Sequence, residues 1–212
     1  MSIWGTVRSR SLVAATLAAM LSALANGTCA AASPHYEPEP ANQPVTLRGV
    51  SRTSVEYSVP NVKLIREDGK TVTLVNELDD GRPVVLNFIY TTCTDLCPLS
   101  SHVLSQLQRK LGSDRDRVHL VSISIDPEED TPDRLLAYSN KFGAGPGWNH
   151  YTGTVSASIR VQRAFDVYRG DKMSHAPVTL LRMAPGKPWI RFDGFAKADD
   201  LLREFHSLLA AK

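Results

Sequence analysis

The sequence predicts an α/β fold, a sandwich in which helices flank a central mixed sheet that is preceded by an N-terminal β-hairpin. Residues 84–89 form an almost continuous apolar run, which is typical of a central strand buried on both faces, and the run 118–125 predicts a second core strand. Each run is followed by a segment whose apolar residues recur at helical spacing, so strands and helices alternate. Ligands of such sheets gather beyond the carboxyl ends of the strands.

The first elements are a hairpin and a long helix. Residues 62–65 and 71–74 flank Asp68-Gly69, a dipeptide typical of tight hairpin turns. A helix is expected after the strand at 84–89, because Pro98 suits the first turn of a helix and an apolar stripe continues to Gly112.

The second half of the domain repeats the pattern. After the strand at 118–125, Thr131 is expected to cap a helix with Pro132 in its first position, and Gly143 ends it. The remaining elements that we expect are a helix over residues 154–165, a β-ribbon over 178–191 that turns at Ala184-Pro185-Gly186, and a closing amphipathic helix over 199–209.

The N-terminal quarter is expected to serve export. Residues 1–32 are typical of a secretory signal, because Arg8 and Arg10 precede an apolar stretch too short to span a membrane comfortably. Residues 33–55 form a Pro-rich linker, and 56–212 form the folded domain. We therefore expect an exported, periplasmic protein whose signal is either cleaved or kept as a tether to the inner membrane.

Charge and cysteine content narrow the classes of partner. The formal net charge is +2 and charges of both signs are interspersed, so we expect no nucleic-acid partner. Of the three cysteines, Cys29 lies in the predicted signal, and only Cys93 and Cys97 lie in the folded domain. Exported thiols meet an oxidising compartment, so a function that needs them also needs a thiol reductant as partner.

The cysteine pair follows the strand at 84–89 and precedes a helix. If Cys93 and Cys97 lie one helical turn apart, their Cα atoms are roughly 6 Å from each other, within the range of a disulfide. Unpaired backbone N–H groups at a helix start stabilise thiolates, which favours metal binding and disulfide exchange. A purely structural disulfide is the third interpretation, which the short loop between the cysteines disfavours.

Four landmarks resemble the Sco/SenC family of exported thioredoxin-like copper proteins. They are residues 90–98 (YTTCTDLCP), residues 125–132 (IDPEEDTP), the segment around His175 and the closing helix. The resemblance implies a thioredoxin-like sandwich that holds a copper ion, Cu(I) or Cu(II), with Cys93, Cys97 and His175. It also implies delivery of copper to the copper-centre subunit of a respiratory oxidase or to another exported copper protein. The sequence departs from the family pattern at Thr94 and Ser174, where Pro and Asp are usual.

The donor set agrees with this chemistry. Thiolates prefer soft Cu(I), and an imidazole lets the same site hold Cu(II), although zinc accepts these donors too. Asp95 and Asp126 are secondary candidates that would orient ligands or bias thiol ionisation, while Met173 is more typical of packing. We expect a copper chaperone rather than an enzyme. The alternative is a thiol-disulfide oxidoreductase in which Cys93 attacks a target disulfide and Cys97 resolves the mixed intermediate.

Overall fold

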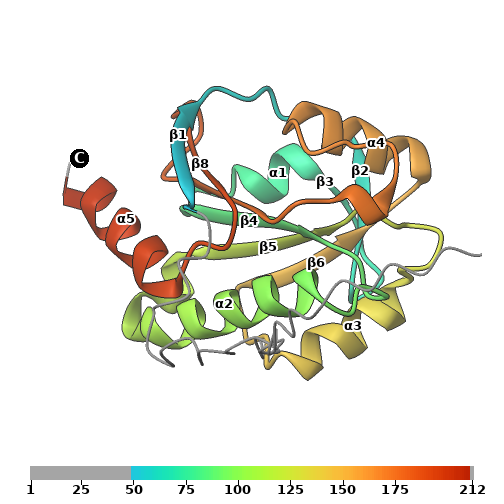
Figure 1. The fold of residues 1–212 in the computed structure, drawn as a ribbon, viewed down its shortest axis with the longest axis horizontal. Coiled ribbons are helices and arrows are strands. Elements are labelled where there is room, and N and C mark those ends of the chain that lie inside the picture. Colours follow the sequence, from blue (N-terminus) through green and yellow to red (C-terminus); the bar gives the residue numbers. More distant parts are fainter. Residues whose placement is uncertain (1–48, 211–212) are drawn as a thin grey trace, which may run out of the picture. The chain divides into compact units, whose positions relative to one another are not determined.

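An eight-stranded mixed sheet forms the centre of the described part of the chain (Figure 1). The structure is a computed structural model that describes residues 49–210. The strand order is β1-β8-β7-β4-β5-β6-β2-β3, in which β4, β5 and β6 run parallel and the other neighbours are antiparallel. The elements in chain order are β1 (Ser51–Val55), β2 (Lys63–Arg66), β3 (Thr71–Thr73), α1 (Leu74–Leu78), β4 (Val84–Ile89), α2 (Leu96–Lys110), η1 (Gly112–Arg117), β5 (His119–Ser124), α3 (Pro132–Lys141), β6 (Trp148–Thr152), α4 (Val155–Ala164), η2 (Lys172–Ser174), β7 (Val178–Arg182), β8 (Trp189–Asp193) and α5 (Ala198–Ala210).

The predicted mixed sheet with flanking helices and an N-terminal hairpin is confirmed. The β2–β3 hairpin pairs Lys63 with Thr73, and all six residues of β4 and of β5 are buried. Thr131 caps α3 as expected, since its hydroxyl accepts a hydrogen bond of 3.3 Å from the backbone N–H of Arg134.

Two strands and one short α-helix were not predicted, because their sequences carry weak local signals. β1 lies inside the range 33–55 that we expected to be linker, yet it pairs along its whole length with β8. Its residues are mostly exposed and polar, as is common in an edge strand. The sequence therefore lacks the alternation of apolar and polar residues that would predict a strand here. β6 contains Asn149 and His150, and α1 has only five residues. The folded domain therefore begins before residue 56.

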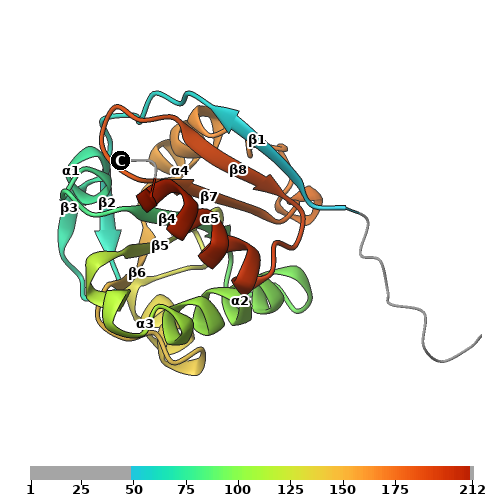
Figure 2. The ribbon, with the colours of Figure 1, turned by 90° about the vertical axis from the view of Figure 1, so that its left-hand side faces the viewer.

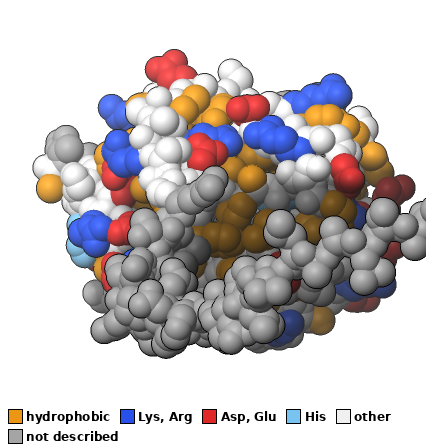
Figure 3. Space-filling view, viewed as in Figure 1, with side chains coloured by type: hydrophobic (Ala, Val, Ile, Leu, Met, Phe, Trp, Pro, Cys, Tyr) orange, Lys and Arg blue, Asp and Glu red, His pale blue; other side chains and the backbone are white. Residues whose placement is uncertain are grey.

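The predicted signal, 1–32, and the linker up to residue 48 lie outside the described residues, as does Cys29. Among residues 49–210, no helix combines the length and the apolar character needed to cross a membrane. Acidic and basic side chains are interspersed on the face shown in Figure 3, in line with the small net charge.

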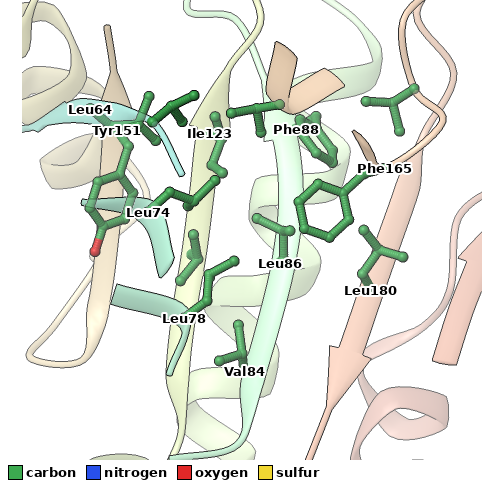
Figure 4. Close-up of a cluster of buried hydrophobic side chains, with 14 of the residues drawn as sticks. Leu64, Leu74, Leu78, Val84, Leu86, Phe88, Ile123, Tyr151, Phe165 and Leu180 are labelled. Carbon is green, nitrogen blue, oxygen red and sulfur yellow. The ribbon is translucent and has the colours of Figure 1, made fainter. Parts of the chain in front are cut away.

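Two apolar layers hold the helices against the sheet. On one face, alternate residues of β4 (Val84, Leu86 and Phe88) pack with Leu74 and Leu78 of α1 and with α4 (Figure 4). On the other face, Val85 packs with α2 and α5, which lie next to each other (Figure 2). The alternation of side chains along β4 fills both layers, as expected for a strand that is covered on both sides.

His150 of β6 is a buried base at the centre of this fold. It is fully buried, stacks on Trp148 with ring centroids 5.3 Å apart, and its two ring nitrogens find no hydrogen-bond partner among the described residues. Burial lowers the pKa of His150 to about 3. In the unfolded chain this imidazole titrates near its ordinary pKa of about 6.5.

We therefore expect acid to destabilise the fold through His150. Between about pH 6.5 and pH 3 the unfolded chain binds a proton that the folded chain excludes, so stability falls as pH falls, by up to about 1.4 kcal/mol per pH unit from this group. Urea unfolding between pH 7 and pH 4 should give a flatter pH dependence for His150→Phe than for the parent. The exposed His102 supplies the control, His102→Phe, which should keep the parent slope. An unchanged slope in His150→Phe contradicts this prediction.

Candidate metal centre

The cysteine pair lies where β4 ends and α2 begins, as predicted. The backbone N–H of Cys97 donates a hydrogen bond of 3.3 Å to Sγ of Cys93, and both residues are free thiols. Asp95 is the N-cap of α2, and Pro98 lies in the first helical turn, where backbone N–H groups have no partner within the helix. The start of α2 thus directs N–H groups at the sulfur of Cys93.

The two thiols are unequal. Burial acts to raise the pKa of Cys93, but hydrogen bonds from the backbone N–H and the thiol of Cys97 outweigh it and lower that pKa below its usual range. Burial raises the pKa of Cys97, which is only 2% exposed, well above its usual range, and the neighbouring Cys93 adds to the effect. Cys93 therefore has more thiolate character than Cys97, which is a buried thiol.

His175 follows η2 and lies beside the end of β4. The antiparallel pairing of β7 with β4 places the segment before Val178 next to the strand end that carries the cysteines. The ring Nε2 of His175 donates a hydrogen bond of 3.3 Å to the carbonyl oxygen of Phe88. Burial lowers the pKa of His175, so the ring is neutral at pH 7, and its Nδ1 keeps a free lone pair. The side chain of His175 is buried and anchored to β4.

One cavity joins the two halves of the predicted site. It measures about 160 Å³ and is lined by Cys93 and His175, with Asp95 at its border. Among residues 49–210, however, no three His, Cys, Asp or Glu side chains converge into a ready-made metal cluster. The structure therefore brings Cys93 and His175 to one cavity, with Cys97 buried next to Cys93, but it does not hold the three donors at bonding distance from a single point.

The predicted secondary residue Asp126 acts on the His175 side of the site. Its buried carboxylate accepts a hydrogen bond of 2.5 Å from Nζ of Lys172, the first residue of η2. The backbone N–H of His175 donates to the carbonyl oxygen of Lys172, 3.1 Å away. Asp126 therefore positions the turn that presents His175.

Asp130 is a site residue that the sequence did not single out. It is fully buried, and its carboxylate accepts hydrogen bonds from the backbone N–H of Thr91 at 3.0 Å, the Thr91 hydroxyl at 2.5 Å and the Ser124 hydroxyl at 2.6 Å. These bonds tie the cysteine loop to the end of β5. The only local signal was a carboxylate shortly after a core strand, and Thr91, its partner in the cysteine loop, lies 39 residues away in sequence.

Tyr90 and Met173 also line the cavity. Burial and the neighbouring Cys93 raise the pKa of Tyr90 to about 12, so its hydroxyl stays protonated at pH 7. That hydroxyl donates to Sδ of Met173 at 3.7 Å. Met173 is 74% exposed, so the interpretation of this residue as a packing side chain is wrong.

A mixed sheet between helices, with a reduced cysteine pair at the start of the helix that follows a central strand, defines a thioredoxin-like thiol protein. Within that class the chain belongs to a particular family. The family model described as SCO1/SenC matches residues 52–210, and the chain is a member of the SCO1/SenC family.

Curated relatives and solved structures agree with this family membership. A SCO1 protein homologue of Bacillus subtilis is 30% identical over 106 residues, which are 50% of this chain and 54% of the relative. The structure of Arabidopsis thaliana ScoI with copper bound is 30% identical, covers 71% of this chain and 96% of that chain, and superposes with a TM-score of 0.59. BsSco, described as a Sco protein with a disulfide switch, is 27% identical with a TM-score of 0.60, and the match covers 76% of this chain and 98% of that one. The chain spans about half the length of the first curated relatives.

Proposed function

We propose that this chain is an exported metallochaperone that binds one copper ion through Cys93, Cys97 and His175 and passes it to the copper-centre subunit of a respiratory oxidase or to another exported copper protein. The observation that carries the proposal is the single cavity lined by Cys93 and His175, with Cys97 one helical turn from Cys93. A Sco structure with copper bound and the description of Sco proteins as cytochrome c oxidase assembly proteins support it.

The donor chemistry fits such a cargo. A thiolate at Cys93 and a neutral imidazole with a free Nδ1 are donors that copper prefers, and the hydrogen bond from Nε2 to a backbone carbonyl is the usual support of a ligating histidine. Since the donors border a cavity without already converging, copper binding requires small side-chain rotations that bring them together. Three protein ligands leave a position at which an acceptor thiolate enters, so the ion passes by ligand exchange without release into solution.

A copper titration of the reduced full chain tests this function. We expect one equivalent of Cu(I) or Cu(II) to bind, and Cu(II) to produce an intense sulfur-to-copper absorption band. His175→Ala should remove tight Cu(II) binding. It should weaken Cu(I) binding without abolishing it, because the two thiolates remain. His102→Ala changes an exposed histidine of α2 and should bind as the parent does. Failure of the parent to bind either form stoichiometrically contradicts the proposal.

A second candidate, thiol-disulfide exchange, is favoured by the unequal thiols. An accessible Cys93 of lowered pKa beside a buried Cys97 is the arrangement of an attacking and a resolving cysteine. The two functions are compatible, since the cysteines of a copper acceptor must be reduced before they take the metal. Export, a tether to the inner membrane and a thiol reductant as partner remain part of the same proposal.

A further inference from the structure

Met173 places a third soft donor at the cavity that Cys93 and His175 share. It lies on η2, two residues before His175, and lines the same cavity. With 74% of its surface exposed, it contributes little to packing. A single exposed methionine is unremarkable in itself, but this one borders a thiolate and an imidazole.

The backbone of Met173 is fixed. Its N–H donates a hydrogen bond of 2.9 Å to the carboxylate of Asp171, and the preceding Lys172 is paired with Asp126. The thioether accepts a hydrogen bond from the Tyr90 hydroxyl at 3.7 Å. A thioether sulfur has two lone pairs, so this weak bond leaves one available. The backbone of Met173 is therefore fixed beside the site, while the weak contact of its sulfur leaves the side chain free to rotate.

A thioether ligand distinguishes between the two oxidation states of copper. Thioether sulfur is soft and polarizable, and as a ligand it suits Cu(I). Met173 both lines the cavity and is mostly exposed to solvent, so an ion that comes from solvent can reach it.

We propose that Met173 is a further copper ligand: its thioether occupies the position that Cys93, Cys97 and His175 leave open when Cu(I) is bound, biases the site toward Cu(I), and is the ligand that an acceptor thiolate displaces. This inference rests on the proposed copper function and adds a residue to it. Flexible rotation of the methionine side chain brings the sulfur inward while η2 stays in place.

X-ray absorption at the copper edge tests this ligand directly. The full reduced chain is grown with selenomethionine and loaded with one equivalent of Cu(I). We expect a selenium neighbour at bonding distance from copper, which is distinguishable from the cysteine sulfurs. Met173→Leu should remove it, while the matched control Met183→Leu, which alters a buried core methionine of similar volume, should retain it.

Affinity measurements supply the second readout. Met173→Leu should weaken Cu(I) binding by about tenfold or more and leave the Cu(II) absorption band unchanged. One equivalent of bound Cu(I) without a selenium neighbour, or with a neighbour that persists in Met173→Leu, overturns this inference and leaves the copper function standing. Absence of copper binding in the parent overturns both.

Discussion

Replacing Asp130 with alanine is expected to lower the free energy of unfolding by about 3 kcal/mol or more. The change leaves three donors without their acceptor: the N–H and hydroxyl of the half-buried Thr91 and the hydroxyl of the buried Ser124. Urea unfolding at pH 7 measures the loss. Glu128→Ala is the matched control, since it removes an exposed carboxylate from the same loop and should cost less than about 0.5 kcal/mol.

The same variant has a second consequence at the cysteine loop. Thr91 lies two residues before Cys93, so the loss of its carboxylate partner frees the segment that positions the sulfur. Asp130→Asn keeps the size of the side chain and one acceptor oxygen, and we expect an intermediate loss. Equal stability of Asp130→Ala and Glu128→Ala would refute the assigned role of Asp130.

The two cysteines of the metal-free, reduced chain are expected to react with iodoacetamide at very different rates. At pH 7 Cys93 should be alkylated at least about tenfold faster than Cys97, because it is more exposed and has more thiolate character. The rate at Cys93 should rise with pH through a midpoint below the ordinary thiol pKa of about 8.5, and the rate at Cys97 through a midpoint above it. Mass spectrometry of the modified peptides measures both rates, and the chain unfolded in urea, where the rates should converge, is the control.

Cys97→Ser uses this inequality to separate the two functions. The variant keeps the reactive Cys93 and lacks the thiol that resolves a mixed disulfide. Accumulation of mixed disulfides with partner proteins favours exchange chemistry, whereas their absence, together with tight copper binding by the parent, favours the chaperone.

In the alkylation experiment, similar rates at the two cysteines in the folded chain would contradict the assignment of Cys93 as the thiol with more thiolate character.

Much of the fold follows from local patterns. β4 is predicted by its continuous apolar run, the hairpin by Asp68-Gly69, and the start of α3 by Thr131 and Pro132, because in each case the determining residues are adjacent in sequence. β1 and β6 lack such patterns. They are strands because β8 and β5 offer them edges to pair with, which no local signal reveals.

The residues of the candidate site likewise divide into those that local sequence patterns predict and those that they do not. The sequence predicts Cys93 and Cys97 as site residues from their place between a strand and a helix. His175 is predicted only from the resemblance to a family. Asp130 and Tyr90 depend on contacts between segments that are distant in sequence, so only the fold identifies them. The exposure of Met173 likewise depends on how η2 lies at the cavity, and residue type alone favoured the opposite interpretation.

The loop between β5 and α3 fixes both halves of the site at once. Asp130 holds the cysteine segment through Thr91, and Asp126, four residues earlier, holds the histidine turn through Lys172. The spacing between these two carboxylates therefore sets the separation of the two ligand-bearing segments. Insertion of a single residue between them would misalign sulfur and imidazole together, whereas the turn at Gly186, far from the cavity, should tolerate the same change in length.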